Sequence, residues 1–428
     1  MREAAYMAQR HSIDPSRVET VLVRLEELVR ANSGDDPFDE VFKIILVKLY
    51  SEKMGINLDL NEKKLKVRFD EMLVAIDKTW PNLLTINQKR TLLSEGHLRI
   101  CLHEIETSSF FDEGLVLLDV FFEHLVSHTS KGQKGQFFTP RYIIEFCTKI
   151  IAPKFDENIL DPACGSGGFL FHSLNYIKNH SDEHSKNIWG FDFDPRAVSV
   201  AKTLFSLCGG NADKIFNVNS LLRQSQNTSL LVQDAHEKNI TIEDILRIKT
   251  KKFNGFDAIL TNPPFAGEIK QESLINSYDL AKSNRRNERD VLFVERCIEL
   301  LKPNGRLAIV LPHNKIGGKS YSYVREYLMR KMRVVCVVSL PRTTFLPHTH
   351  QKAEIIFAKK REKPVKNIDS EEILFITSDV ESKDTKGNLI LKNESDSNAS
   401  DWDRINHDFE DCILHFNKFI SETGLEWY

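Results

Sequence analysis

Four consecutive residues, Asn262 to Phe265, carry groups suited to chemistry on an amine. They follow the apolar run FDAILT, which is expected to be a buried strand. Pro263 and Pro264 fix a rigid loop and remove two backbone donors, so carbonyl oxygens stay available as acceptors. The Asn262 side chain and the Pro263 carbonyl can accept both N–H bonds of an aromatic amine and localise its lone pair toward an incoming methyl group. Phe265 offers a face for stacking a base swung out of a duplex, whereas a structural Pro-Pro turn is the alternative for this motif alone.

A glycine-rich stretch, DPACGSGGF at 161–169, is expected at the carboxyl end of the first strand of a parallel sheet. Gly165, Ser166 and Gly167 let the backbone turn tightly and approach a ligand that a larger side chain would block. The stretch lacks the GK[ST] of a phosphate-binding loop and the GxGxxG spacing of a dinucleotide fold. It therefore predicts a different small-molecule site, although a tight turn without a ligand is the alternative.

Two acidic residues follow the next predicted strand in the sequence GFDFDP at 190–195. An acidic side chain at that point can accept hydrogen bonds from both hydroxyls of a ribose. Asp194 precedes Pro195 and is typical of a helix N-cap residue. We therefore expect Asp194 to cap a helix and Asp192 to remain free for the ligand.

The pattern of apolar residues changes along the chain and predicts three parts. Up to about residue 125 it is helical, with apolar residues at i, i+3, i+4 and i+7. After a polar, glycine-containing stretch at 127–136, short apolar runs alternate with helical segments, which is typical of an α/β fold with a parallel sheet. The predicted domains are a helical domain at 1–126, a catalytic domain at 127–362, and a hairpin or loop followed by a helix at 363–428.

Individual elements are predicted from the same patterns. The N-terminal helices are expected at 18–30, 38–53, 67–80 and 114–126. The strands are expected at 158–161, 187–192, 215–218, 256–261, 306–312, 334–341 and 353–359. A short helix is expected near 242–249, and a last one over 402–420, where an apolar stripe either contacts a partner or covers the chain's own core.

Composition excludes several classes of protein. With 41% hydrophobic and 28% charged residues the chain is typical of a globular protein. The seven cysteines show neither CxxC spacing nor clustering with histidines, so we expect no metal site and a reducing, cytoplasmic location. The N-terminal sequence has no apolar core of a signal peptide, and no apolar run is long enough to span a bilayer.

Taken in order, these segments resemble the DNA adenine-N6 methyltransferases, and most closely the modification subunits of type I restriction-modification systems. The resemblance runs from about Asp36 to Asn417. Its segments are FDEVFKIILVKLYSEK, GQFFTPRYI, DPACGSGGFL, TNPPF, LFVERCIELLKPNGRLAIVLP and SLPRTTF. It implies a seven-stranded, Rossmann-like methyltransferase sheet with a reversed last strand, and S-adenosylmethionine as the cofactor.

The resemblance also implies roles for particular residues. Those expected over the methionine part of the cofactor are Gln136, Phe137, Phe138, Thr139 and Pro140. Asp161 and Gly165 would flank its amino-acid portion, Asp192 would hold the ribose, and Asn262 to Phe265 would form the catalytic loop. Where relatives often carry an acidic residue after the third strand, this sequence has Asn219, which can accept the same hydrogen bond from the cofactor's adenine but adds no charge.

Duplex DNA is the expected substrate, yet the formal net charge is only −3. DNA is bound largely through neutralisation of phosphates by Lys and Arg. The candidate DNA-binding residues are Lys131, Lys134, Lys282, Arg285, Arg286 and Arg289. A solvated run of charges is the alternative for each cluster. Because no region is left for a target-recognition domain, we expect a separate specificity subunit, and a restriction subunit is a further expected partner.

Two other functions are compatible with these motifs. A protein methyltransferase acting on a glutamine amide would also use an NPP-aromatic loop. A regulator that binds S-adenosylmethionine without catalysis would share the glycine-rich stretch, but it would not need Asn262.

Overall fold

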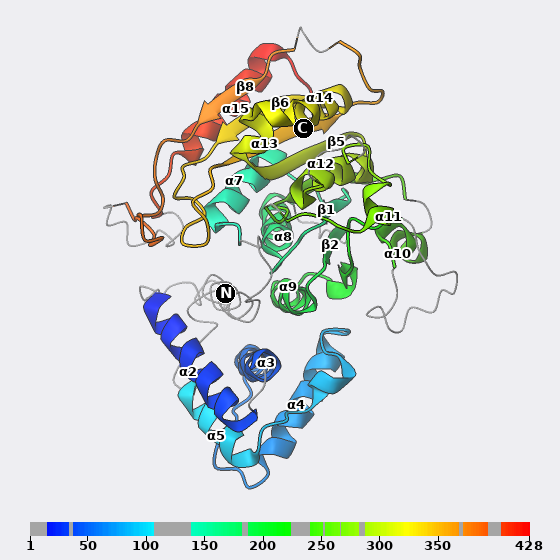
Figure 1. The fold of residues 1–428 in the computed structure, drawn as a ribbon. Helices are drawn as coiled ribbons and strands as arrows, with labels where there is room; N and C mark the ends of the chain where they lie inside the picture. Colours follow the sequence, from blue (N-terminus) through cyan, green and yellow to red (C-terminus); the bar gives the residue numbers. More distant parts are fainter. Residues whose placement is uncertain are drawn as a thin grey trace. The chain divides into compact units, whose positions relative to one another are not determined.

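The computed structural model describes residues 15–33, 37–106, 138–181, 187–223, 240–250, 253–265, 267–281, 287–367, 371–392 and 404–428. The chain folds into two compact units. The first comprises Met1–Gln133 and Ser199–Asp213, and the second comprises Lys134–Val198 and Lys214–Tyr428 (Figure 1). The predicted domain limits after residues 126 and 362 stay a prediction.

The first unit contains α-helices, as its apolar periodicity predicts. They are α2 (Pro15–Ser33), α3 (Phe38–Met54), α4 (Leu65–Thr79) and α5 (Glu95–Glu104), with a short 3-10 helix η1 (Ile86–Lys89). α3 is its buried centre, where Lys43 donates to Glu40 over 2.5 Å and Thr91 donates to the same carboxylate over 2.6 Å. α3 ends at Gly55, whose φ of 65° is readily adopted only by glycine. The helices predicted near 18–30, 38–53 and 67–80 are confirmed, and the one at 114–126 lies outside the described residues.

The second unit is built on a sheet of eight strands in the order β3-β2-β1-β4-β5-β7-β6-β8. The strands are β1 (Ile159–Asp161), β2 (Ile188–Asp192), β3 (Ile215–Asn217), β4 (Phe256–Thr261), β5 (Leu301–Pro312), β6 (Met332–Ser339), β7 (Ala353–Lys360) and β8 (Leu374–Thr377). β1 to β5 pair in parallel, and β7 runs antiparallel to both β5 and β6.

The α/β fold class is confirmed, and so is the reversed strand, but the expected number of seven strands is wrong. β8 lies in the segment that we expected to be a hairpin or loop, and it pairs in parallel with β6. Its residues alternate between half-buried and exposed, so the sequence LFIT lacks the continuous apolar character of the inner strands.

Helices connect the strands and cover both faces of the sheet. They are α7 (Arg141–Ile151), α8 (Gly168–His180), α9 (Pro195–Leu207), α10 (Ile242–Lys249), α11 (Glu272–Ile275), α12 (Arg289–Leu300), α13 (His313–Gly317), α14 (Ser322–Lys331) and α15 (Phe409–Thr423), with 3-10 helices η2 (Ala212–Lys214) and η3 (Lys319–Tyr321). The helix predicted near 242–249 is thus confirmed as α10. On β7, Ile356 and Ala358 join the core formed with α10, α12 and α14. Phe357 points to the opposite face and contacts Phe146 of α7, because successive side chains of a strand alternate between faces.

The C-terminal apolar stripe covers the chain's own core. α15 begins at Phe409, later than expected, and the ring of Phe409 stacks on Phe146 with centroids 4.7 Å apart. Phe416 contacts Phe357 and the buried Trp427, whose indole donates to the carbonyl of Ile150 over 2.8 Å. These side chains are therefore not available to a partner helix, which was the other interpretation of the stripe.

Candidate active site

The three sequence motifs meet because their strands run in parallel. β1 ends at Asp161, β2 at Asp192 and β4 at Thr261, directly before the glycine-rich stretch, the acidic pair and Asn262. In the strand register, Asp161 of β1 lies opposite Gly190 of β2. Ile159 of β1 lies opposite Ile188 of β2 and Ala258 of β4. All three motifs therefore lie at the carboxyl edge of the sheet, where ligands of open α/β folds bind.

The glycine-rich loop adopts backbone conformations that favour glycine. Gly165 has φ 52°, and Gly167 has φ 88° at the N-cap of α8. A Cβ atom built on Gly165 would meet no atom within 4 Å, so the loop faces open space at that point. Ser166 is buried. This loop leaves room for a ligand against the backbone while the helix start behind it stays fixed.

Asp192 and Asp194 have different contacts, and one part of our expectation is wrong. Asp194 accepts from the backbone N–H of Arg196 over 2.9 Å, which confirms it as the N-cap of α9. Asp192 is not free, since its Oδ2 accepts from the N–H of Gly165 over 2.9 Å and its Oδ1 from that of Asp194 over 2.8 Å. Its carboxylate thus holds the glycine loop in place. A carboxylate has about four acceptor positions, so capacity for a ligand hydroxyl remains.

Asp161 and Asp192 form a buried acidic pair on the two sides of the glycine loop. Burial raises the pKa of Asp161 to about 7 and the pKa of Asp192 to about 6. Asp161 accepts from the N–H of Ala163 over 3.0 Å. In the described part of the chain neither carboxylate forms an ion pair. A ligand that brings a positive charge and hydroxyl groups would stabilise both carboxylates in their ionised form.

Asn262 is held in one orientation and keeps one unused acceptor. Its Nδ2 donates to the hydroxyl of Thr139 over 2.9 Å. Its Oδ1 is buried and has no hydrogen-bond partner. A buried polar atom without a partner costs free energy on the order of 1–3 kcal/mol, so it is uncommon in the absence of a function. The site therefore presents a fixed carbonyl oxygen that can accept an N–H bond.

Phe265 does not present an open ring. Only 2% of the residue is exposed, and its ring packs edge-on against Phe345 with centroids 5.4 Å apart. The expectation that Phe265 offers a free face to a base does not hold in this conformation, because the neighbouring loop covers the ring. Pro263 is buried and Pro264 half-buried beside it.

The other predicted site residues are placed as follows. Phe138, Thr139 and Pro140 are half-buried and directly precede α7, whereas Gln136 and Phe137 lie outside the described residues. The Oδ1 of Asn219 accepts from the N–H of Leu221 over 3.1 Å within its own turn. Of the six basic residues, Lys131, Lys134, Lys282, Arg285 and Arg286 lie outside the described residues, and Arg289 opens α12. The N–H of Arg289 donates to the carbonyl of Gly267, just after the catalytic loop, over 3.1 Å.

Sequence reasoning overlooked Phe193. The residue is 63% exposed although it is a large aromatic, and it lies between Asp192 and Asp194 at the carboxyl end of β2. Its carbonyl accepts from the Nδ2 of Asn217 over 2.8 Å, which fixes the backbone at this point. An aromatic between two acidic residues in GFDFDP is the signal that could have indicated an exposed apolar surface for a planar ligand.

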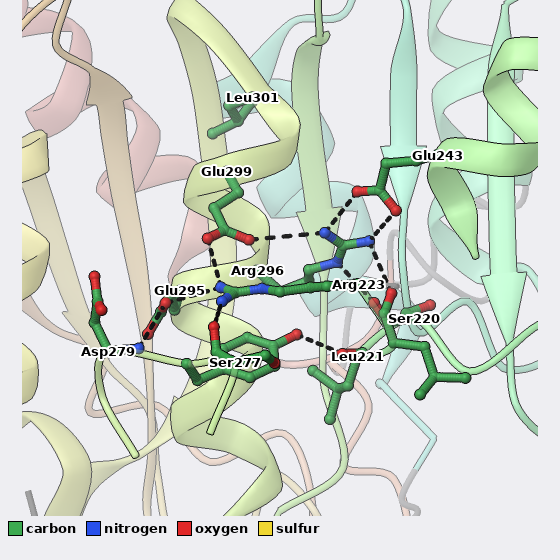
Figure 2. Close-up of polar contacts among 12 residues, drawn as sticks. Ser220, Leu221, Arg223, Glu243, Ser277, Asp279, Glu295, Arg296, Glu299 and Leu301 are labelled. Carbon is green, nitrogen blue, oxygen red and sulfur yellow. Dashed lines mark hydrogen bonds and ion pairs between the residues drawn. The ribbon is translucent and has the colours of Figure 1, made fainter. Parts of the chain in front are cut away.

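A cluster of buried charges braces the segments beside the site (Figure 2). Arg296 of α12 donates to the carbonyl of Ser220 over 2.7 Å and forms an ion pair with Glu243 over 2.7 Å. It therefore holds the turn that begins at Asn219. The hydroxyl of Ser220 donates to the carbonyl of Pro162 over 2.6 Å and links this turn to the glycine-rich motif.

The same cluster holds the segment that follows the catalytic loop. Glu295 accepts from the N–H groups of Asp279 and Leu280 over 2.9 and 2.8 Å. Arg223 donates to Glu295 over 2.8 Å and lies over the ring of Tyr278, 3.6 Å from its centroid. α12 thus fixes one segment on the cofactor side and one on the catalytic-loop side.

Two further properties concern the described ranges as a whole. No group of three or more His, Cys, Asp or Glu side chains there is arranged to hold a metal ion. None of the helices in these ranges combines the length and the apolar character needed to cross a membrane.

The arrangement of motifs agrees with a family match. Residues 117–421 match the family described as N-6 DNA methylase, which is most of the chain. This chain belongs to the N-6 DNA methylase family. In this family member, the glycine-rich loop, the acidic pair and Asn262 all lie within the matched range.

Individual relatives of this N-6 DNA methylase family member are more distant. The methylase subunit of the type I restriction enzyme EcoEI from Escherichia coli is 29% identical over 268 residues, which are 62% of this chain and 50% of that subunit. The StySPI methylase subunit from Salmonella potsdam is 26% identical over 236 residues, 54% of this chain and 42% of the relative. The chain thus matches half or less of the length of these curated relatives.

Solved structures confirm the fold. A modification subunit assigned to a type I restriction enzyme of Vibrio vulnificus YJ016 has a TM-score of 0.62 at 18% identity, with 96% of this chain and 91% of that chain covered. The type I restriction-modification methyltransferase subunit from Streptococcus thermophilus has a TM-score of 0.59 at 16% identity and covers 95% and 94%. The chain thus shares its fold with proteins of low sequence identity.

Proposed function

We propose that this chain transfers a methyl group from S-adenosylmethionine to the exocyclic amino group of adenine in duplex DNA, as the modification subunit of a type I restriction-modification system. One observation carries the proposal: the buried Oδ1 of Asn262 has no partner, and Thr139 fixes its carboxamide. Membership of the N-6 DNA methylase family supports the choice of adenine as the target.

Asn262 and the prolines that follow it would activate the amine. Adenine's amino nitrogen is a weak nucleophile because its lone pair is delocalised into the ring. When Asn262 Oδ1 and the Pro263 carbonyl accept its two N–H bonds, the lone pair is localised on nitrogen and directed away from the two acceptors. Because Thr139 takes one amide hydrogen of Asn262, the oxygen stays directed at the substrate position. No titrating base is required for this activation.

The residues around the glycine loop fit the proposed cofactor. S-adenosylmethionine supplies an electrophilic methyl group on a positively charged sulfur when it is bound. Asp161 and Asp192 would hold the ammonium and ribose hydroxyl groups, which compensate buried carboxylates. Gly165 leaves space for the ligand, Asn219 would face the cofactor's adenine, and the exposed ring of Phe193 offers an apolar surface beside it.

A transfer assay with labelled S-adenosylmethionine tests the proposal. The purified chain, alone and with a candidate specificity subunit, is incubated with duplex DNA and separately with a protein acceptor. Mass spectrometry of digested DNA should find the label on the N6 atom of adenine. Label in protein glutamine would support the alternative amide methyltransferase, and cofactor binding without transfer to any acceptor would support a non-catalytic regulator.

We also propose that the chain depends on partners, namely a specificity subunit and a restriction subunit. Its net charge of −3 offers limited electrostatic attraction to DNA. One solved relative in this fold, with a TM-score of 0.55, is described in terms of complex assembly of the type I system. Sequence-specific methylation by the isolated chain would contradict this dependence.

A further inference from the structure

Two loops beside the catalytic loop are devoid of acidic residues. The first follows β5 and covers His313 to Arg325, which includes α13, η3 and the first turn of α14, and the second joins β6 to β7 over Leu340 to Ala353. Neither contains Asp or Glu, although the chain as a whole has 61 acidic and 58 basic residues. We call these two segments the edge loops. The two segments therefore carry basic residues without acidic ones, although the chain as a whole has a net charge of −3.

The acidic side chains that border the edge loops differ in their partners. The buried Lys315 forms ion pairs with Glu288 and, over 3.6 Å, with Asp290. Glu354 accepts a hydrogen bond from His313 over 2.7 Å. Asp384, on the neighbouring hairpin, accepts from the side chain and backbone of Asn388 over 2.9 Å each, which orders the carboxylate without neutralising it. The ion pairs of Lys315 therefore offset two of the acidic groups near these loops, whereas Asp384 and the exposed Glu326 form no ion pair within the described ranges.

Several basic side chains of the edge loops are directed to solvent. Lys319, Arg342 and His350 are exposed, and Lys352 is half-buried. Within the described ranges, none of the four side chains forms an ion pair. Basic groups that do not serve an internal ion pair are the ones that can neutralise an external anion.

The edge loops lie together and next to the catalytic loop. The N–H of His313 donates to the carbonyl of Lys352 over 2.8 Å, which joins the first loop to the second. Phe345 of the second loop contacts Phe265 of the catalytic loop, with ring centroids 5.4 Å apart. β5 pairs with β4 in parallel, so the loop after β5 leaves the sheet at the same edge as Asn262. The basic side chains of the edge loops therefore lie at the same edge of the sheet as Asn262.

We propose that the edge loops bind backbone phosphates of the DNA that flanks the target adenine, with Lys319, Arg342 and Lys352 as the phosphate contacts. This inference rests on the proposed function and assigns a DNA-binding surface to residues outside the clusters that the sequence indicated. Three cationic side chains on fixed loops can each neutralise one phosphate of the regularly spaced DNA backbone. A base swung out of the duplex leaves those phosphates next to the mouth of the catalytic site.

The test compares two triple variants with the same loss of charge. Lys319→Ala, Arg342→Ala and Lys352→Ala are combined in one protein. The matched control combines Arg330→Ala, Lys363→Ala and Lys366→Ala, three residues at the end of α14 and after β7, at the opposite edge of the sheet. Affinity for a fluorescein-labelled duplex is measured by anisotropy over a series of salt concentrations, and thermal melting checks that both variants are folded.

The edge-loop variant should bind the duplex at least about tenfold more weakly than the unmodified chain. Its slope of log affinity against log salt should be smaller by about 0.9 for each lost phosphate contact, or about 2.7 in total. The control should bind like the unmodified chain, and both variants should bind S-adenosylmethionine normally in calorimetry. Equal losses in the two variants would overturn the proposal, because they would show only the effect of net charge. So would an unmodified chain that does not bind the duplex at low salt.

The outcome is separable from that of the proposed function. If the unmodified chain methylates adenine but the edge-loop variant binds DNA like the control, the surface is wrong and the function stands. If the surface binds DNA as expected but no methyl group is transferred, the function fails and the surface stands. A different result would identify a protein partner instead of DNA. In that case the edge-loop variant binds DNA like the unmodified chain, and an acidic protein binds the unmodified chain but not the variant.

Discussion

The Asn262 site and the Arg296 cluster are two buried polar regions of the same unit that differ in how far they are satisfied. Arg296 is 2% exposed, and its guanidinium contacts the carbonyls of Ser220 and Leu222 and the carboxylate of Glu243. Asn262 Oδ1 is also buried but has no partner. Buried polar groups are normally paired within the protein, so the pairing of Arg296 is explained by folding, whereas the unpaired oxygen of Asn262 supports the proposed contact with a ligand.

The two regions also differ in what they hold. The cluster fixes the turn after Asn219 and the segment at 277–280 (Figure 2). Thr139 holds the carboxamide of Asn262 and leaves its oxygen unpaired. The comparison therefore predicts that variants in the cluster act on stability, whereas variants in the site act on binding and catalysis.

The largest effect is expected for Arg296→Ala. Removing the guanidinium leaves the carbonyls of Ser220 and Leu222 without this charged donor, so the free energy of unfolding should fall by about 3 kcal/mol. The lost ion pair adds little, because the side chain of Glu243 is 44% exposed. Asn262→Ala should change it by less than about 1.5 kcal/mol, because only the hydrogen bond with Thr139 is lost. Urea unfolding followed by circular dichroism measures both values, with Arg330→Ala as the control. Similar losses for Arg296→Ala and Asn262→Ala would remove the distinction between the two regions.

Asp192→Ala should weaken binding of S-adenosylmethionine by about tenfold or more. The variant loses the acceptor for the Gly165 N–H as well as the proposed ribose contact, and hydrogen bonds to a charged group contribute about 1.5–3 kcal/mol each. Asp194→Ala is the matched control, since its carboxylate caps α9. Calorimetry measures the affinity of both variants for S-adenosylmethionine. A larger loss of affinity for Asp194→Ala than for Asp192→Ala would show that Asp194 is the ligand-binding residue and Asp192 is not.

Cofactor affinity should increase as pH rises from about 5 to about 8. Burial raises the pKa of Asp161 to about 7 and that of Asp192 to about 6, so both are protonated in acid and must ionise to hold a cationic ligand. For the ligand-free chain, pH acts on the stability of the folded state in the opposite direction. Raised carboxyl pKa values stabilise the folded state at low pH, and this contribution is lost between about pH 4 and pH 7.

Calorimetric titrations of S-adenosylmethionine at several pH values, with thermal melting in parallel, measure both trends. Asp161→Asn should make the pH dependence of binding shallower, because only Asp192 then titrates in this range. An affinity that is independent of pH in the unmodified chain would show that neither carboxylate contacts the ligand.

The smallest effect is expected for Asp194→Ala on stability. Loss of an N-cap acceptor typically lowers the free energy of unfolding by about 1 kcal/mol. Asp194→Asn keeps an acceptor oxygen and should restore most of that value. Chemical unfolding of the two variants tests the cap, and equal destabilisation by both would show that the charge at the helix N-terminus matters more than the hydrogen bond.

Motif order and strand periodicity predicted the α/β fold and placed Asn262 directly after β4, whereas the catalytic role of this loop stays a prediction. The apolar runs of the inner strands are specific because both faces are buried, whereas β8 has alternate exposed residues and resembles a loop in sequence. The resemblance gave Thr139 only a cofactor role, because nothing in the spacing indicates a bond to Asn262 from 123 residues away. Burial of Phe265 depends on Phe345 from a distant loop, and Arg296 and Glu295 look like ordinary charges of an amphipathic helix until their partners are known.

The most direct test of the central claim is the rate of methyl transfer by Asn262→Ala, measured in single turnover with the specificity subunit, labelled S-adenosylmethionine and duplex DNA. Losing one preorganised hydrogen-bond acceptor at the reacting nitrogen should lower this rate by at least about 10²-fold, while calorimetry finds the cofactor affinity unchanged. A variant that keeps more than about a tenth of the rate of the unmodified chain would contradict the account, because the unpaired oxygen would then have no part in activating the amine.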